Sequence, residues 1–126
     1  MNEKSIKILI AEDDKFLKEL YSLTFSNGPY DFSITSNGKE FLEKIKNFLP
    51  DIIIIDLIMP VMDGFDLIKS LKTNPEYKEI PIIVASSLGQ SDDINKAIKL
   101  GASDYLVKSD IKATDITEKI KAILEK

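Results

Sequence analysis

Runs of β-branched apolar residues alternate with segments of helical period along the whole chain. Each run is four to seven residues long by our reading, is bounded by polar or turn-forming residues, and is typical of a buried strand (roughly 4–8 residues). Apolar positions recur every three or four residues in the segments between the runs, as in an amphipathic helix. The pattern predicts strands within residues 6–11, 30–36, 51–56, 80–86 and 103–108, and helices within residues 14–25, 37–49, 65–74, 92–101 and 114–126.

Several residues mark where the expected helices begin and end. Asn37 followed by Glu40 three residues later indicates a capping-box-like start, and Gly101 indicates a C-terminal stop. Pro75 ends the third helix, because proline cannot continue it. The helical period predicts that the first helix turns Leu17, Leu20, Tyr21 and Thr24 inward. It predicts that the last helix turns Ile116, Ile120 and Ile123 inward.

Strict alternation of strand and helix predicts a doubly wound α/β domain. Consecutive parallel strands joined through a helix adopt right-handed crossovers, which place helices on both faces of the sheet. The unbroken apolar runs support this, since strands covered on both faces need no polar side. At 126 residues the chain fits a single domain over residues 1–126. Ligands of such sheets gather beyond the carboxyl ends of the strands.

Composition excludes several kinds of chemistry. The sequence contains no His and no Cys, so imidazole catalysis, thiolate chemistry and disulfides within the chain are excluded. The formal net charge is −4, and all 17 basic residues are Lys. The chain has no Arg, whose planar guanidinium group makes paired hydrogen bonds to the edge of guanine. We therefore expect no direct DNA binding. No apolar stretch is long enough to span a bilayer, so we expect a cytoplasmic domain without membrane insertion.

Charged and hydroxyl side chains stand at the ends of four of the expected strands. Glu12 and Asp13 come after the first strand, Asp56 ends the third, Ser86 ends the fourth and Lys108 ends the fifth. Carboxylates brought this close repel one another and raise one another's pKa. A hard divalent cation relieves that repulsion, and Mg²⁺ takes carboxylate and carbonyl oxygens together with water and phosphate. The pattern therefore indicates a Mg²⁺ site at this edge of the sheet.

Helix capping is the simpler explanation for some of these acidic residues. We interpret Asp14 as such a cap, because acidic residues commonly begin helices. Capping does not explain Asp56, since "LIMP" follows it and no helix begins at once. Nor is "AEDDK" a glycine-rich phosphate loop, because its carboxylates repel anions until a metal arrives.

Four motifs together resemble the receiver domain of bacterial response regulators: "ILIAEDD", "DLIMPVMDG", "PIIVASS" and "GASDYLVK". They occur in the order and at the spacing of that family, over nearly the whole chain. The resemblance implies a chemotaxis-type, single-domain protein of two-component signalling. It also implies a flavodoxin-like, five-stranded parallel sheet in the order 2-1-3-4-5 with five helices.

The resemblance also implies a role for each residue at the strand ends. Asp56 would accept a phosphoryl group from a histidine kinase or a histidine phosphotransfer protein. Mg²⁺ would be held by Glu12, Asp13, Asp56 and the backbone carbonyl of Ile58. Lys108 would pair with a phosphoryl oxygen. The chain would then be a phospho-acceptor with at most self-catalysed phosphoryl transfer and dephosphorylation, not an enzyme acting on other molecules.

Two further residues would carry the signal outward in such a family member. The hydroxyl of Ser86 would be drawn towards the phosphoryl group, and Tyr105 would turn inward into the space left by Ser86. These movements would change the surface of the fourth helix, fifth strand and fifth helix, and so regulate a protein partner.

The sequence departs from the family where Ser109 follows Lys108, because the family usually has a proline there with a cis peptide bond. We expect the cis bond to be retained, although it costs about 2.5–4 kcal/mol before a non-proline residue. Three other readings remain open: a receiver-like interaction module that no longer takes phosphate, a receiver from a longer regulator, and an aspartate-nucleophile phosphatase of the haloacid dehalogenase type. The last needs a second Asp two residues after Asp56, where this chain has Ile58.

Overall fold

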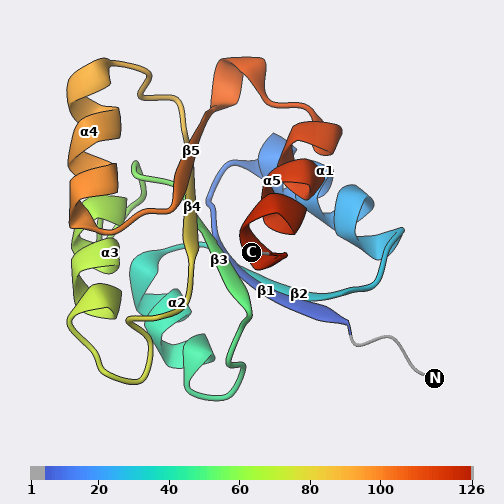
Figure 1. Cartoon of the computed structure of the whole chain (residues 1–126), viewed down its shortest axis with the longest axis horizontal. Helices are drawn as coiled ribbons and strands as arrows, with labels where there is room; N and C mark the ends of the chain where they lie inside the picture. The colour runs from blue at the N-terminus through green and yellow to red at the C-terminus, as the bar shows by residue number, and fades with distance from the viewer. Residues whose placement is uncertain (1–4, 126) are drawn as a thin grey trace.

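Within residues 5–125, which the computed structural model describes apart from the side chain of residue 110, five parallel strands form one sheet in the order β2-β1-β3-β4-β5 (Figure 1). The expected doubly wound α/β fold is therefore confirmed. The strands are β1 (Ile6–Ala11), β2 (Tyr30–Thr35), β3 (Ile52–Ile55), β4 (Ile82–Ser86) and β5 (Asp104–Val107). The helices are α1 (Lys15–Ser26), α2 (Gly38–Ile45), α3 (Gly64–Lys72), α4 (Ser91–Leu100) and α5 (Ala113–Leu124), with a short 3₁₀ helix, η1 (Lys108–Asp110), before α5.

Helices cover both faces of the sheet, α1 and α5 on one side and α2, α3 and α4 on the other (Figure 1). Alternate residues of each strand point to opposite faces. In β3, Ile53 and Ile55 pack among the side chains of α2, α3 and α4, whereas Ile52 and Ile54 pack with α1 and α5. Because both faces are buried, all four positions are apolar, which explains the unbroken isoleucine run.

The helix ends agree with the expected caps. Asp14 is the N-cap of α1, and its carboxylate accepts a hydrogen bond from the backbone N–H of Leu17 at 2.8 Å. Asn37 caps α2 in the same way, accepting from Glu40 N–H at 2.9 Å. Gly101 ends α4 with φ of 124°, a left-handed conformation that glycine adopts without strain.

The inward face of α1 differs in part from its prediction. Leu17 and Tyr21 are buried as expected, but Phe25 completes the buried face, while Leu20 and Thr24 are only partly buried. Leu17, Tyr21 and Phe25 stand four residues apart and so share one face of the helix, where the two aromatic rings bury more area than Leu20 or Thr24 would. Residue 126, the end of the expected last helix, lies outside the described residues. None of the described helices is both long and apolar enough to cross a membrane.

Strand register places the polar strand ends side by side. Ala11 pairs with Ile55, and the N–H of Asp56 donates to the carbonyl of Ala11 at 3.0 Å. The residues that follow β1 and β3 therefore leave the sheet at the same level. At the other side Ser86 pairs with Val107, so Lys108 also leaves the sheet at this edge.

Candidate functional site

Three carboxylates gather where β1 and β3 end. Glu12, Asp13 and Asp56 each offer an oxygen, and these oxygens lie within 4.8 Å of one another. Glu12 is fully buried and Asp56 is 2% exposed, whereas Asp13 is exposed. A buried carboxylate is costly unless it is paired or holds a cation, so a cluster of this kind calls for positive charge. The cluster predicted from sequence is therefore present in the fold.

Lys108 supplies part of that positive charge. Its ammonium lies 2.8 Å from Oε2 of Glu12 and 3.0 Å from Oδ2 of Asp56, and so bridges the two buried carboxylates. Burial by itself would lower the pKa of Lys108, but its hydrogen bonds to Glu12 and Asp56 and their negative charges raise the pKa overall. The lysine is therefore held in its charged form.

The expected cis bond between Lys108 and Ser109 is not found. No described peptide bond is cis, and the chain turns into η1 directly after β5. The prediction was wrong, and the reason is physical. A trans backbone already delivers the long side chain of Lys108 to both carboxylates, so no contact remains to offset the cost of a cis bond before serine.

One lysine does not balance three carboxylates. Burial, and then the negative charge of Asp56, raises the pKa of Glu12 from 4.5 to about 7, although the hydrogen bond from Lys108 opposes the shift. The raised pKa shows that a negative charge on Glu12 is costly here, a cost that a bound cation would relieve. Carboxylate oxygens at this spacing are the ligands that Mg²⁺ prefers, and the donor set fits that ion.

The loop after β4 is held on both sides by polar side chains. Ser86 is fully buried, and its hydroxyl accepts a hydrogen bond from the N–H of Leu88 at 3.2 Å. The hydroxyl of Tyr105, from the neighbouring β5, donates to the carbonyl of the same Leu88. Leu88 thus links the buried strand end to a residue near the surface.

The comparisons with known proteins agree on one family. A model described as "response regulator receiver domain" matches residues 8–121. The chain belongs to the response regulator receiver domains. It is similar to the chemotaxis protein CheY of Thermotoga maritima, with 38% identity over 104 residues, which cover 81% of this chain and 84% of that protein.

Solved structures of receivers share the fold closely. A putative response regulator from Chloroflexus aurantiacus is 29% identical with a TM-score of 0.90, over 98% of this chain and 100% of that one. CheY4 of Vibrio cholerae is 25% identical with a TM-score of 0.88, over 95% of this chain and 99% of that one.

Relatives of this receiver include longer proteins as well. The alkaline phosphatase synthesis transcriptional regulatory protein PhoP of Bacillus subtilis is 28% identical over 95% of this chain, but over only 49% of its own length. Receiver domains are phospho-acceptors of two-component signalling and bind Mg²⁺ at an acidic pocket. They act with histidine kinases and downstream targets, and the partner is not determined by these relatives.

Gly64, the first residue of α3, supports the receiver site through a close approach to the backbone after β3. A Cβ at this position would lie 2.4 Å from the carbonyl oxygen of Asp56 and 2.5 Å from Cα of Leu57. Glycine therefore allows α3 to begin against the backbone of Asp56. The preceding Asp63 caps α3, accepting from Asp66 N–H at 2.9 Å. The "DG" pair was the available signal, but the close approach needed the tertiary fold.

Proposed function

We propose that this receiver is a phosphorylation-dependent switch in which Asp56 takes a phosphoryl group from a histidine kinase or a histidine phosphotransfer protein. One observation carries the proposal: the carboxylate of Asp56 is almost fully buried at the end of β3, 3.0 Å from the ammonium of Lys108 and beside the oxygens of Glu12 and Asp13. Positioning and neutralisation of oxygen charge are the main requirements of phosphoryl transfer.

The transfer step exchanges one phosphorus bond for another. An oxygen of Asp56 forms a bond to phosphorus while the bond between phosphorus and the donor's histidine nitrogen breaks, and that nitrogen keeps the electron pair. Glu12, Asp13, Asp56 and the backbone carbonyl of Ile58 would hold Mg²⁺, which would neutralise charge on the phosphoryl oxygens. Lys108 is already within reach of Asp56 and would pair with one of those oxygens.

The hydrogen bonds of Leu88 offer a route from this site to the surface. The hydroxyl of Ser86 would donate a hydrogen bond to a phosphoryl oxygen, and its movement towards that oxygen would strain the bond that it accepts from Leu88 N–H at 3.2 Å. A shift of Leu88 would also affect Tyr105, whose hydroxyl donates to the Leu88 carbonyl. We therefore propose Ser86 and Tyr105 as the switch pair. Tyr105 is only partly buried, so its ring has room to change position.

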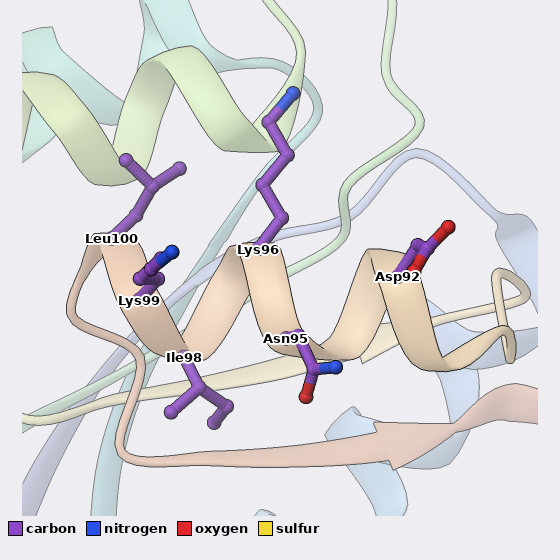
Figure 2. A pocket seen from close by; sticks show the side chains of 6 residues that line it. All are labelled: Asp92, Asn95, Lys96, Ile98, Lys99 and Leu100. Atoms are coloured by element: carbon purple, nitrogen blue, oxygen red, sulfur yellow. The ribbon is translucent and has the colours of Figure 1, made fainter.

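The surface of α4, β5 and α5 is the proposed place of output. An open pocket of about 980 Å³ lies along α4 (Figure 2). In Figure 2, Asn95 and Ile98 point towards the side of β5, whereas Lys96 and Leu100 point towards α3. The ammonium of Lys96 lies 4.2 Å from the centre of the Phe65 ring, which ties α4 to α3. Ile98 is 45% exposed and offers a partner an apolar contact.

A chemical phosphodonor tests the proposal without knowledge of the kinase. We expect the protein to gain the mass of one phosphoryl group when it is incubated with Mg²⁺ and acetyl phosphate, and to lose this gain in Asp56→Asn. Asp51→Asn is the matched control, because Asp51 stands at the other end of the same isoleucine run. Intact-protein mass spectrometry measures the gain.

The opposite result would identify a different function. No uptake, together with Mg²⁺ affinity too weak to measure, would favour a receiver-like interaction module that no longer takes phosphate. Uptake that survives in Asp56→Asn would place the acceptor at another residue. The assignment of residues 1–126 to one receiver domain, alone or within a longer regulator, stays a prediction.

A further inference from the structure

Two buried side-chain polar atoms among the described residues have no hydrogen-bond partner: Oε1 of Glu12 and the hydroxyl of Tyr21. Both residues are fully buried. Oε2 of Glu12, by contrast, accepts from Lys108 at 2.8 Å and from Asp14 N–H at 3.1 Å. Buried polar groups in native proteins are almost always paired, so two orphans in one region need a common explanation.

The two atoms are chemically complementary. An ionised carboxylate oxygen only accepts hydrogen bonds, whereas a phenol hydroxyl can donate one. Burial, followed by the negative charges of Glu12 and Asp56, raises the pKa of Tyr21 well above its ordinary value, which keeps the hydroxyl proton in place.

Tyr21 lies on the side of the sheet that Glu12 faces, because Ile10 of β1 packs in one core with Tyr21, and Glu12, two residues later, continues the same side of the strand. Tyr21 shares the buried face of α1 with Leu17 and Phe25, and its ring stacks on that of Phe25 with centroids 6.0 Å apart and an interplanar angle of 4°. The ring is therefore fixed by apolar packing. An apolar environment of this kind would accept phenylalanine as well as tyrosine, so packing explains the ring but not the hydroxyl.

We propose that Tyr21 is a positioning residue whose hydroxyl donates a hydrogen bond to a buried water, which in turn donates to Oε1 of Glu12. The bridge keeps Oε2 turned towards Lys108 and the other carboxylates. A single bridging water satisfies both atoms at once, since water can accept from the phenol and donate to the carboxylate. The inference rests on the proposed function, because it takes Glu12 to be part of the Mg²⁺ site. Partners that orient metal ligands commonly change metal affinity by 10–100-fold when they are removed.

Tyr21→Phe removes the hydroxyl and leaves the ring. Tyr77→Phe is the matched control, because Tyr77 is 9% exposed and packs on the opposite face of the sheet. Mg²⁺ alone is titrated into each protein by calorimetry, near pH 8. We expect binding about tenfold weaker in Tyr21→Phe and unchanged in Tyr77→Phe. Urea unfolding without Mg²⁺ is the second measurement, and we expect the folding equilibrium constant of Tyr21→Phe to fall about fivefold.

The two measurements separate the possible outcomes. A loss of Mg²⁺ affinity of about threefold or more, specific to Tyr21→Phe and without a gain in stability, supports the inference. A smaller loss, or an equal loss in Tyr77→Phe, overturns it and leaves the proposed function intact. A more stable Tyr21→Phe protein also overturns it, since the hydroxyl would then be unpaired and costly. Wild-type protein that does not bind Mg²⁺ would instead remove the proposed function, and this inference with it.

Discussion

Two aspartates flank the same run of four isoleucines, yet the fold gives them opposite environments. Asp51, at the amino end of β3, is exposed, and its carboxylate accepts a hydrogen bond from the backbone N–H of Lys7 at 2.8 Å. Asp56, at the carboxyl end, is 2% exposed and lies among Glu12, Asp13 and Lys108. Asp51 therefore serves only to link the start of β3 to β1, whereas Asp56 belongs to a charged site.

The difference between the two aspartates comes from the edge of the sheet at which each lies. All strands of the described sheet are parallel, so their carboxyl ends meet at one edge, where the loops into the helices begin. At that edge Glu12 follows β1 and Lys108 follows β5. The same residue type at the amino edge meets only the backbone of a neighbouring strand. Function in this fold therefore depends on strand polarity as much as on residue type.

A cavity in β3, the strand between the two aspartates, should have the largest effect on stability. Ile53 is fully buried among the side chains of the α2–α4 face, and Ile53→Ala leaves a cavity there. We expect the free energy of unfolding to fall by roughly 2–5 kcal/mol, as measured by urea denaturation followed by circular dichroism.

A surface truncation provides the control for this loss. Leu23 is 68% exposed on α1, and Leu23→Ala should change the free energy of unfolding by less than about 0.5 kcal/mol. Equal losses in the two variants would contradict a rigid, closely packed β3.

The buried carboxyl group of Glu12, beside Asp56 at the carboxyl end of β3, should make the stability of the metal-free protein depend on pH. The pKa of Glu12 is raised from 4.5 to about 7 by burial and by Asp56, so between these values the folded state binds more protons than the unfolded state. Stability is therefore greatest below about pH 4.5 as far as Glu12 is concerned, and it falls as the pH rises to about 7. We expect a loss on the order of 1–3 kcal/mol.

Urea denaturation at a series of pH values without Mg²⁺ measures this loss. In Glu12→Gln the decline should be much smaller, because the titrating group is absent. Stability that rises with pH across this window in the wild type, or an equal decline in Glu12→Gln, would contradict the assignment. Added Mg²⁺ should restore stability above about pH 7, because it binds the deprotonated carboxylates.

A substitution at the amino end of β3, where Asp51 lies, should have the smallest effect on stability. Asp51→Ala removes the exposed hydrogen bond from Lys7 N–H, and we expect it to lower the free energy of unfolding by about 0.5–1 kcal/mol. Calorimetric titration should find its Mg²⁺ affinity equal to that of the wild type. A marked loss of Mg²⁺ affinity in Asp51→Ala would show that the two ends of β3 are coupled through the strand.

Much of the site was predictable because the relevant residues directly follow strands. Glu12, Asp13, Asp56 and Lys108 all stand at the ends of recognisable apolar runs, and parallel strand order is enough to bring such ends together. The cap at Asp14 was predictable for a similar reason, since it depends on residues within one helical turn.

Other features depend on atoms far apart in the sequence. The trans path after Lys108 was missed because the cost of a cis bond had to be weighed against contacts that only the folded loop defines. The close approach of Gly64 to the backbone of Asp56 depends on how the loop after β3 folds back. The helical period predicted that the ring of Tyr21 faces the core, but it gave no sign that its hydroxyl is buried without a partner.

By itself, the sequence determined the alternation of strands and helices and the residues at the strand ends. It could do so because hydrophobic period and helix capping act over a few neighbouring residues. Only the tertiary structure decided which oxygen of Glu12 faces Lys108, that the Lys108–Ser109 bond is trans, and where the hydroxyl of Tyr21 lies. These depend on distances of a few ångströms between distant segments, over which hydrogen bonds and burial energies change most steeply.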